Sequence, residues 1–325
     1  MHDIRHLLPS SEAKFKDSGI TKAGELLKAW NGSPASGIGL IGAPLSKTSI
    51  SHSGAAMAPE VIRKMLSSFT TYSVERDLDL ESSIITDFGD ITPHVTDIHE
   101  TRSRFVQVIQ EVLERNPDIV PVILGGDHSI SASSIKAFRK NKGPVGVIQF
   151  DAHHDLRNLG DGGPSNGTPF RQLIEGTDIK GEHLIQIGIR DFSNGRMYTN
   201  YAKENGITVY SMNEVSRLGT KKILEESIRT LKSKVSSIYV SVDMDVLDQA
   251  YAPGCPAIGP GGMTSEALIQ GIQYLSACPE VKGMDIVEVD PTLDFRDMTS
   301  RLSAYLILQF LLHRASYKEK NHPEE

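Results

Sequence analysis

The hydrophobic pattern along the chain alternates short apolar runs with longer segments of helical periodicity. Eight runs are dominated by Val, Ile, Leu and Gly, which is typical of strands that are buried on both faces of a sheet. They are residues 38–44, 83–89, 120–126, 146–152, 183–189, 207–212, 237–245 and 283–290. Segments of helix length lie between several of these runs, at 101–116, 130–140, 221–233 and 265–277. The alternation predicts βαβ units on a parallel sheet that is covered by helices.

The two ends of the chain differ from this alternating region. Residues 1–35 contain an amphipathic stretch at 21–30, for which we expect a helix within a peripheral arm. A last amphipathic segment at 301–315 precedes a polar tail, 316–325, which has little to bury. No repeat or change of composition marks a linker. We therefore expect an N-terminal arm at 1–35, a single domain at 36–315 and a polar tail at 316–325.

Composition excludes several classes of protein. The 325 residues are 39% hydrophobic and 23% charged, which is ordinary for a globular chain. A net charge of -7 with scattered Lys and Arg argues against a nucleic-acid binder. Cys255 and Cys278 show no zinc-binding spacing and fit a reducing cytoplasm. Residues 1–10 lack a signal-peptide core, and no run approaches a membrane span. We expect a cytoplasmic protein that acts on a small molecule.

Acidic and histidine side chains follow three of the predicted strands. The motifs are GGDHS at 125–129, DAHHD at 151–155 and DMD at 243–245. Ligands of parallel sheets collect at the carboxyl ends of the strands, so these side chains are expected to converge. Extended chain alternates its faces, which places Asp151, His153 and Asp155 on one side and His154 on the other. The six converging side chains are His128, Asp151, His153, Asp155, Asp243 and Asp245.

The charge of this cluster points to metal ions. Four buried carboxylates would repel one another and take up protons unless cations compensate them. Oxygen and imidazole ligands without thiolate suit Mn²⁺ better than a structural zinc site. Two such ions about 3.5–4 Å apart can hold a hydroxide at neutral pH, which favours hydrolysis. An Asp-x-Asp motif by itself is most often a helix cap or a turn, and a histidine such as His128 by itself is most often a hydrogen-bonded loop residue. Three such motifs at three strand ends together favour a metal site.

The same motifs resemble the three metal-binding signatures of the ureohydrolases, which comprise arginases, agmatinases and formimidoylglutamases. Further similar segments are IGAPLSK, GAAMAPEVIR, FGD at 88–90, APGCPAIGPGG at 252–262 and IVEVDPTLDFRDMTSR at 286–301, so the resemblance covers about residues 36–315. It implies a three-layer α/β/α fold with a central, mostly parallel eight-stranded sheet. The periodicity of the strands alone does not distinguish this open sheet from a closed barrel. It also implies two Mn²⁺ ions per subunit and a homo-oligomer, a trimer or hexamer.

The resemblance assigns roles residue by residue. One ion would be held by His128, Asp151, Asp155 and Asp243, and the other by Asp151, His153, Asp243 and Asp245, with Asp151 and Asp243 as bridges. A bridging hydroxide would attack the amidinium carbon, and Asp155 would pass a proton to the leaving amine. Glu288 would pair with the cationic nitrogens of the substrate, although by itself it reads as a surface carboxylate. His154, Asp127 and Asp248 would orient the ligands.

Loop details resemble the formimidoylglutamases within this family, because LRNLGDGGPSNGTPFR follows the second motif and Gln249 replaces a usual Pro. N-formimidoyl-L-glutamate carries two carboxylates, which arginines in the site loops would bind. The candidates are Arg157, Arg190, Arg196 and Arg296, of which we expect Arg157 and Arg190 to contact substrate. Asn166 is expected beside the substrate, where arginases and agmatinases usually carry a proton-shuttling His.

Three hypotheses follow from these residues. The first is hydrolysis of N-formimidoyl-L-glutamate to L-glutamate and formamide, a step of histidine degradation. The alternative is an agmatinase or another guanidino hydrolase that releases urea; arginines around the site would repel the cationic tail of agmatine. A metal-binding scaffold without catalysis is the third hypothesis, and the complete ligand set together with Glu288 argues against it.

Overall fold

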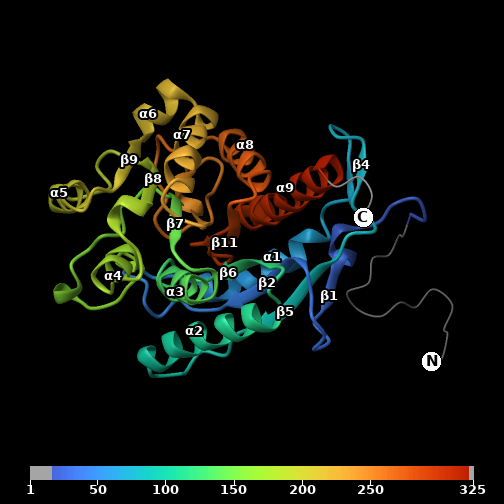
Figure 1. Cartoon of the computed structure of the whole chain (residues 1–325), viewed down its shortest axis with the longest axis horizontal. Helices are drawn as coiled ribbons and strands as arrows, with labels where there is room; N and C mark the ends of the chain where they lie inside the picture. The colour runs from blue at the N-terminus through green and yellow to red at the C-terminus, as the bar shows by residue number, and fades with distance from the viewer. Residues whose placement is uncertain (1–16, 322–325) are drawn as a thin grey trace.

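A nine-stranded sheet, parallel throughout, forms the centre of the molecule (Figure 1). The structure is a computed structural model that describes residues 17–321. The strand order is β1-β5-β2-β6-β11-β10-β7-β8-β9. The bounds are β1 (Leu27–Ala29), β2 (Gly37–Ala43), β5 (Ile85–Asp90), β6 (Ile119–Gly125), β7 (Val145–Phe150), β8 (Leu184–Ile189), β9 (Thr208–Ser211), β10 (Ser237–Asp243) and β11 (Val281–Val287). A separate antiparallel hairpin pairs β3 (Tyr72–Ser73) with β4 (Leu78–Asp79).

Helices cover both faces of the sheet and give the expected three-layer α/β/α fold (Figure 1). One apolar core lies against α1 (Ala58–Leu66), α6 (Met212–Leu218), α7 (Thr220–Lys232), α8 (Ser265–Ser276) and α9 (Met298–Asn321). The other lies against α2 (Ile98–Arg115), α3 (Ile130–Lys142), α4 (Pro169–Glu175) and α5 (Arg196–Glu204). Short 3-10 helices are η1 (Ala23–Leu26), η2 (Ala55–Met57), η3 (Leu159–Asp161), η4 (Gly181–His183), η5 (Met244–Val246) and η6 (Phe295–Asp297).

The strands at the centre of the sheet are the ones that the apolar runs describe best. Every residue of β6, β7, β8 and β10 is buried, as continuous apolar runs predict for strands covered on both faces. The prediction of full burial is wrong for β9, which is half-buried throughout, and for the end of β5, which is exposed. The strand β9 forms an edge of the sheet, where helices cover less of the backbone.

The amphipathic stretch at 21–30 does not form the expected helix. It contains the single turn η1, and Leu27–Ala29 then becomes β1, which pairs in parallel with β5 and adds a ninth strand to the expected eight. Pairing with the open edge of β5 outweighs the local helical pattern of these residues. The division into arm, domain and tail stays a prediction. Helix α9 continues through 316–321 of the expected tail, and residues 1–16 and 322–325 lie outside the described residues.

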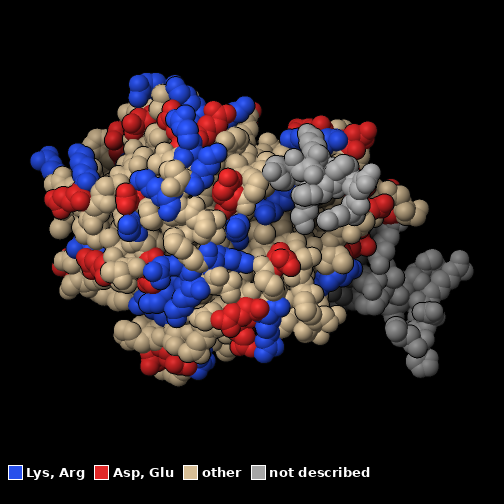
Figure 2. All heavy atoms as spheres, viewed as in Figure 1, with Lys and Arg blue, Asp and Glu red and all other residues tan. Residues whose placement is uncertain are grey.

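Charged side chains of both signs are interspersed over the face shown in Figure 2. Among residues 17–321, no helix combines the length and the apolar character that crossing a membrane requires.

The sheet topology places the chemical motifs side by side. The strands β6, β11, β10 and β7 are consecutive neighbours in the sheet, although they are far apart in sequence. All four run in parallel, so their carboxyl ends lie at one edge. His128 follows β6, Glu288 follows β11, Asp243 ends β10 and Asp151 follows β7. Parallel pairing thus brings the motifs together at the edge where ligands of such sheets bind.

Replacing Phe138 by Ala is expected to lower the free energy of unfolding by about 3–5 kcal/mol. Phe138 of α3 is fully buried, its ring packs edge-on against Tyr239 with centroids 5.2 Å apart, and Gly283 of β11 leaves space for it. Urea denaturation followed by circular dichroism measures the change. Val108→Ala on the exposed side of α2 is the control and should change stability by less than about 0.5 kcal/mol. Equal urea midpoints for both variants would contradict the assigned core.

Candidate metal centre and active site

The first motif forms a tight turn between β6 and α3 that presents His128 to the carboxyl edge of the sheet. Gly126 makes the turn possible, because a Cβ at this position would lie 1.8 Å from the backbone oxygen of Leu45. The His128 side chain is 1% exposed. The partners of this buried imidazole must therefore come from the residues at the ends of the neighbouring strands.

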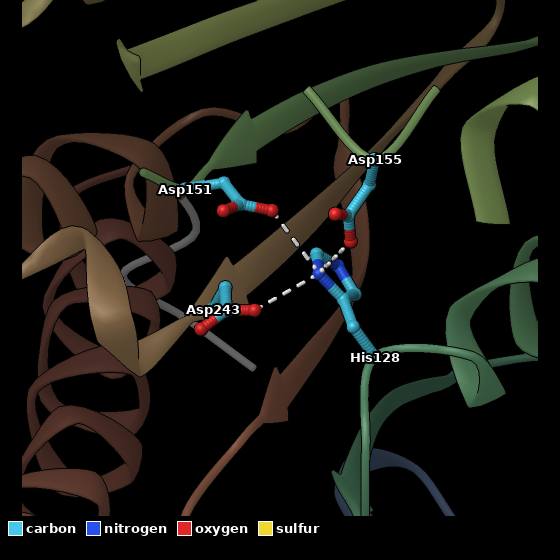
Figure 3. Close-up of side chains that lie close together, drawn as sticks. All are labelled: His128, Asp151, Asp155 and Asp243. Carbon is cyan, nitrogen blue, oxygen red and sulfur yellow. Dashed lines mark ion pairs between the residues drawn. The ribbon is translucent and has the colours of Figure 1, made fainter. Parts of the chain in front are cut away.

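Three carboxylates from two other segments converge on His128 (Figure 3). The Nδ1 atom lies 3.1 Å from Asp151 Oδ2, 2.9 Å from Asp155 Oδ2 and 3.0 Å from Asp243 Oδ2. Even so, Nδ1 is buried and has no hydrogen-bond partner among the described residues, since none of these oxygens is placed for a hydrogen bond from it. One ligand atom from each of the four residues lies within 4.8 Å of the others, which is close enough for all four to hold one metal ion.

A hydrogen-bond pair behind His128 fixes which ring nitrogen faces the carboxylates as a ligand. The Ser241 hydroxyl donates to Asp285 Oδ1 at 2.7 Å, so its oxygen accepts from His128 Nε2 at 3.0 Å. Against the effect of burial, the three carboxylates raise the pKa of His128 well above its ordinary value. When a cation takes the place of the proton on Nδ1, the ring would keep its proton on Nε2 and present the lone pair of Nδ1 to the ion. A lone pair facing three anions is unfavourable unless a cation or a proton lies between them, which again fits a metal ion.

A second group lies next to the first and contains Asp151, His153 and Asp245. His153 Nδ1 is 3.0 Å from Asp245 Oδ2 and 3.4 Å from Asp151 Oδ1. The charge of Asp245 raises the pKa of His153 to about 12, against the opposing effect of burial. When it holds no cation, the group therefore holds a proton tightly, and a metal ion would replace that proton.

The carboxylate of Asp151 belongs to both groups, with Oδ2 facing His128 and Oδ1 facing His153. The residues brought together are the six predicted ligands. Asp243 joins the first group but not the second, and its Oδ1 accepts a hydrogen bond from the Asp245 amide at 2.8 Å. Burial, together with Asp245, raises the pKa of Asp243 well above its ordinary value. Its role as a second bridge stays a prediction.

Glu288 enters the site from the fourth strand, directly after β11. Its Oε1 accepts from the His128 amide at 2.8 Å and from Asn166 Nδ2 at 3.1 Å. Burial is the main cause that raises the pKa of Glu288 to about 8, and the nearby charge of Asp127 adds to it. A cationic group beside Glu288 would offset the cost of keeping this buried carboxylate ionised.

Two of the acidic side chains sit on strained backbone. The φ angle is 53° at Asp155 and 60° at Glu288, in the left-handed region that non-glycine residues rarely adopt. Such strain costs on the order of 1–3 kcal/mol per residue and is found where the surroundings force a side chain into a functional position. The turn chemistry therefore aims both carboxylates at the cluster.

A cavity of about 230 Å³ opens beside the cluster and is lined by His153, Asp155, Asp243, Asp245 and Glu288. Its remaining walls are Ile50, Ser51, Leu156, Arg157, Asn166, Gly167, Ser193, Asn194, Gly195, Tyr198 and Ala257. The Arg157 guanidinium lies 6.0 Å from the ring centre of Tyr198, and among residues 17–321 it has no carboxylate partner. The cavity thus combines an acidic floor with an unpaired cation at its wall.

The expected contact of Arg190 with the substrate stays a prediction. Its side chain is 7% exposed and does not line the cavity beside the cluster. Its Nη2 donates instead to the backbone oxygens of Asp245 and, at 3.2 Å, Leu247. Through these two backbone oxygens Arg190 stabilises η5, which carries a predicted metal ligand.

The predicted supporting residues lie where they can orient their neighbours. Asp127 is fully buried and accepts from Thr48 and Ser129. Asp248 accepts from the Ala250 and Gly261 amides and closes the loop after η5. His154 belongs to neither metal group, although the strand alternation from which this was predicted does not apply, because β7 ends at Phe150 and Asp155 has a φ of 53°. Cys255 is a buried residue that does not line the cavity.

Sequence reasoning missed the polar side chains behind the ligands. Gln149 and Gln186 are fully buried neighbours on β7 and β8, and Ser241 and Asp285 support His128 from β10 and β11. Asn194 donates to the Ala152 backbone oxygen at 2.9 Å. A signal was present, because a glutamine inside VGVIQF and another inside LIQIGI interrupt otherwise apolar strands.

Comparison with known proteins places the chain in a family. A family model described as the Arginase family matches residues 36–313. The chain is 60% identical over 304 residues to a formimidoylglutamase of Halalkalibacterium halodurans, covering 94% of this chain and 95% of that one. Among solved structures, the formimidoylglutamase of Bacillus subtilis has a TM-score of 0.92 and 48% identity, covering 94% and 95% of the two chains. A formiminoglutamase of Trypanosoma cruzi, solved with Mn²⁺, has a TM-score of 0.79 and 25% identity, covering 86% and 94%.

The Asp/His cluster, its place at the carboxyl edge of the parallel sheet and the family match over most of the chain agree with one another. The chain belongs to the arginase family.

Proposed function

We propose that this protein is a formimidoylglutamase that hydrolyses N-formimidoyl-L-glutamate to L-glutamate and formamide. The observation that carries the proposal is the unpaired Arg157 guanidinium in the wall of a cavity whose floor holds the Asp/His cluster and Glu288. A substrate with a cationic amidinium and two carboxylates matches this distribution of charge. The similarity to two formimidoylglutamases over nearly the whole chain supports the same substrate.

We propose Mn²⁺ as the metal and six residues as its ligands. These are His128, Asp151, Asp155, Asp243, His153 and Asp245. The donor set of carboxylates and imidazoles without thiolate favours Mn²⁺, the ion present in the related formiminoglutamase of Trypanosoma cruzi. When bound, a pair of such ions supplies Lewis-acid activation of water for hydrolysis.

The chain's own residues orient the substrate and move the proton. Glu288 accepts hydrogen bonds from the amidinium nitrogens, and its Oε1 is held for this by the His128 amide and Asn166. The side-chain polar atoms of Asn166 form hydrogen bonds within the protein, since its Oδ1 accepts from the Ile50 amide at 3.0 Å. Asn166 therefore holds Glu288 and forms the wall beside the substrate.

Asp155 is the residue that transfers the proton. Water adds its oxygen to the formimidoyl carbon, the bond from this carbon to the glutamate nitrogen breaks, and that nitrogen takes up a proton. Asp155 lines the cavity, and burial raises its pKa to about 6. Its position at the cavity would allow the Asp155 carboxylate to accept a proton from the attacking water and to pass it to the leaving amine.

Arg157 gives the site its preference for an acidic substrate. Its backbone amide donates to the Gly167 oxygen at 2.9 Å, and Gly167 leaves space for its side chain, since a Cβ there would lie 2.6 Å from Arg157 Cδ. The Arg157 side chain is exposed and lines the cavity, so its guanidinium can reach a substrate carboxylate and bind it bidentately. The cationic tail of agmatine would be repelled at this wall, which ranks the urea-releasing alternative second.

Purified protein loaded with Mn²⁺ is expected to release formamide from N-formimidoyl-L-glutamate and to release no urea from agmatine or arginine. Formamide and glutamate are measured by chromatography and urea by a colorimetric assay. Protein treated with a chelator serves as the control and should recover activity when Mn²⁺ is returned. Urea from agmatine without formamide from formimidoylglutamate would overturn the proposed substrate.

Asp243→Ala is expected to reduce bound Mn²⁺ from about two ions per chain to one or none and to abolish hydrolysis, because the predicted bridge is lost. Elemental analysis of protein purified without chelators measures the metal content. Asp118→Asn, at an exposed position outside the cluster, is the matched control and should keep both metal and activity. Full metal content and turnover in Asp243→Ala would contradict the bridging role.

Arg157→Met is expected to raise KM for N-formimidoyl-L-glutamate by about 10- to 150-fold with a smaller effect on kcat. The reason is that a charge-assisted hydrogen bond contributes about 1.5–3 kcal/mol. Steady-state kinetics separate the two constants. Arg196→Met, at the exposed start of α5 and outside the lining of the cavity, is the control. An unchanged KM in Arg157→Met would show that another group binds the carboxylate.

A further inference from the structure

A line of buried polar side chains connects the cluster with helix α5 and has no part in the chemistry described so far. It consists of Gln149, Gln186 and His154, which are 0%, 0% and 1% exposed. Gln149 and Gln186 are paired neighbours on β7 and β8. Polar groups buried this deeply in a parallel sheet are costly unless each is satisfied, so their hydrogen bonds are informative.

The line begins at the carboxylate that both metal groups share. Gln149 Nε2 donates to Asp151 Oδ2 at 2.6 Å and to the His153 backbone oxygen at 3.2 Å. Both acceptors are oxygens, so the Gln149 amide cannot be reversed without placing its own oxygen against them. Its Oε1 therefore points away from Asp151 and must accept a hydrogen bond.

The same reasoning sets the next two members. Gln186 Nε2 donates to Gln149 Oε1 at 2.7 Å and to the His154 backbone oxygen at 2.7 Å, which leaves Gln186 Oε1 as an acceptor. His154 Nδ1 lies 2.6 Å from this oxygen and must be its donor. The lone pair of the neutral ring is then on Nε2, which accepts from Thr199 Oγ1 of α5 at 3.1 Å.

The far end of the line, Thr199, lies next to residues of the cavity wall. Thr199 follows Tyr198, which lines the cavity beside Arg157. Asn194, also in the wall, accepts from the His154 amide at 2.8 Å. Hydrogen bonds therefore join Thr199 to the carboxylate of Asp151 through His154, Gln186 and Gln149, and each of them is donated toward Asp151. The His154 amide donates in the other direction, to Asn194 of the cavity wall.

We infer that Gln149, Gln186 and His154 are positioning residues, which hold Asp151 Oδ2 toward His128 and fix it relative to the α5 wall. The inference rests on the proposed metal site. Asp151 Oδ1 is held separately by the His153 amide at 2.6 Å, so each oxygen of the shared carboxylate has its own donor. A carboxylate that must face two ions needs both oxygens oriented, and the line supplies the orientation of the second.

The experiment measures Mn²⁺ affinity of the metal-free full-length protein by isothermal titration calorimetry. Gln149→Leu and His154→Leu are expected to weaken Mn²⁺ binding by about 10- to 100-fold, the usual effect of losing a group that orients a ligand. His154→Asn keeps a side-chain N–H donor for Gln186 and should retain affinity close to that of the unchanged protein. Gln270→Leu, at an exposed position on α8, is the control.

The His154 pair separates positioning from packing. Thermal melting of the metal-free variants reports packing, whereas Mn²⁺ affinity reports the orientation of Asp151. Equal affinities in His154→Asn and His154→Leu, or unchanged affinity in Gln149→Leu, would overturn the inference. The readout does not depend on the substrate, so unchanged protein that binds Mn²⁺ but releases no formamide would overturn the proposed function alone.

Discussion

The mutual repulsion of buried carboxylates governs the whole carboxyl edge of the sheet. Asp151, Asp155 and Asp243 lie within 3.1 Å of one imidazole nitrogen, and Asp245 lies 3.0 Å from another. No apolar packing arrangement stabilises such a cluster, since each buried anion costs several kcal/mol unless it is compensated. The raised pKa of His153 has the same cause, because the neighbouring carboxylates stabilise a positive charge on its ring. Cations at this edge would therefore compensate the cluster as well as supply the chemistry.

Holding these anions together requires support from many directions. Strained backbone at Asp155 and Glu288 aims two carboxylates, and Gly126 allows the turn that carries His128. Behind the ligands, Ser241 fixes the ring of His128, and Arg190 holds the backbone of η5. Each support comes from a different strand or loop. A rigid parallel sheet is suited to this task because its strand ends cannot move independently of one another.

Charge is distributed in the cavity so that substrate and site complement each other. The floor is acidic and suits an amidinium, with Glu288 held in place by Asn166. The wall carries Arg157, which suits a carboxylate. Members of the family share the metal chemistry, so the difference between an acidic and a basic substrate must come from such wall residues. An asparagine at position 166 cannot titrate, and for this reason the proposed mechanism assigns proton transfer to Asp155.

The sequence by itself determined the eight apolar strands, the order of strands and helices, and the six side chains of the cluster, because strand periodicity and the three motifs are local properties. Tertiary structure decided the rest. Residues 27–29 became a strand because an open edge of β5 was available for pairing. Arg190 donates hydrogen bonds to two backbone carbonyls, and Gln149 pairs with Gln186 on the neighbouring strand. Those outcomes depend on which strands lie side by side, which a local pattern does not contain.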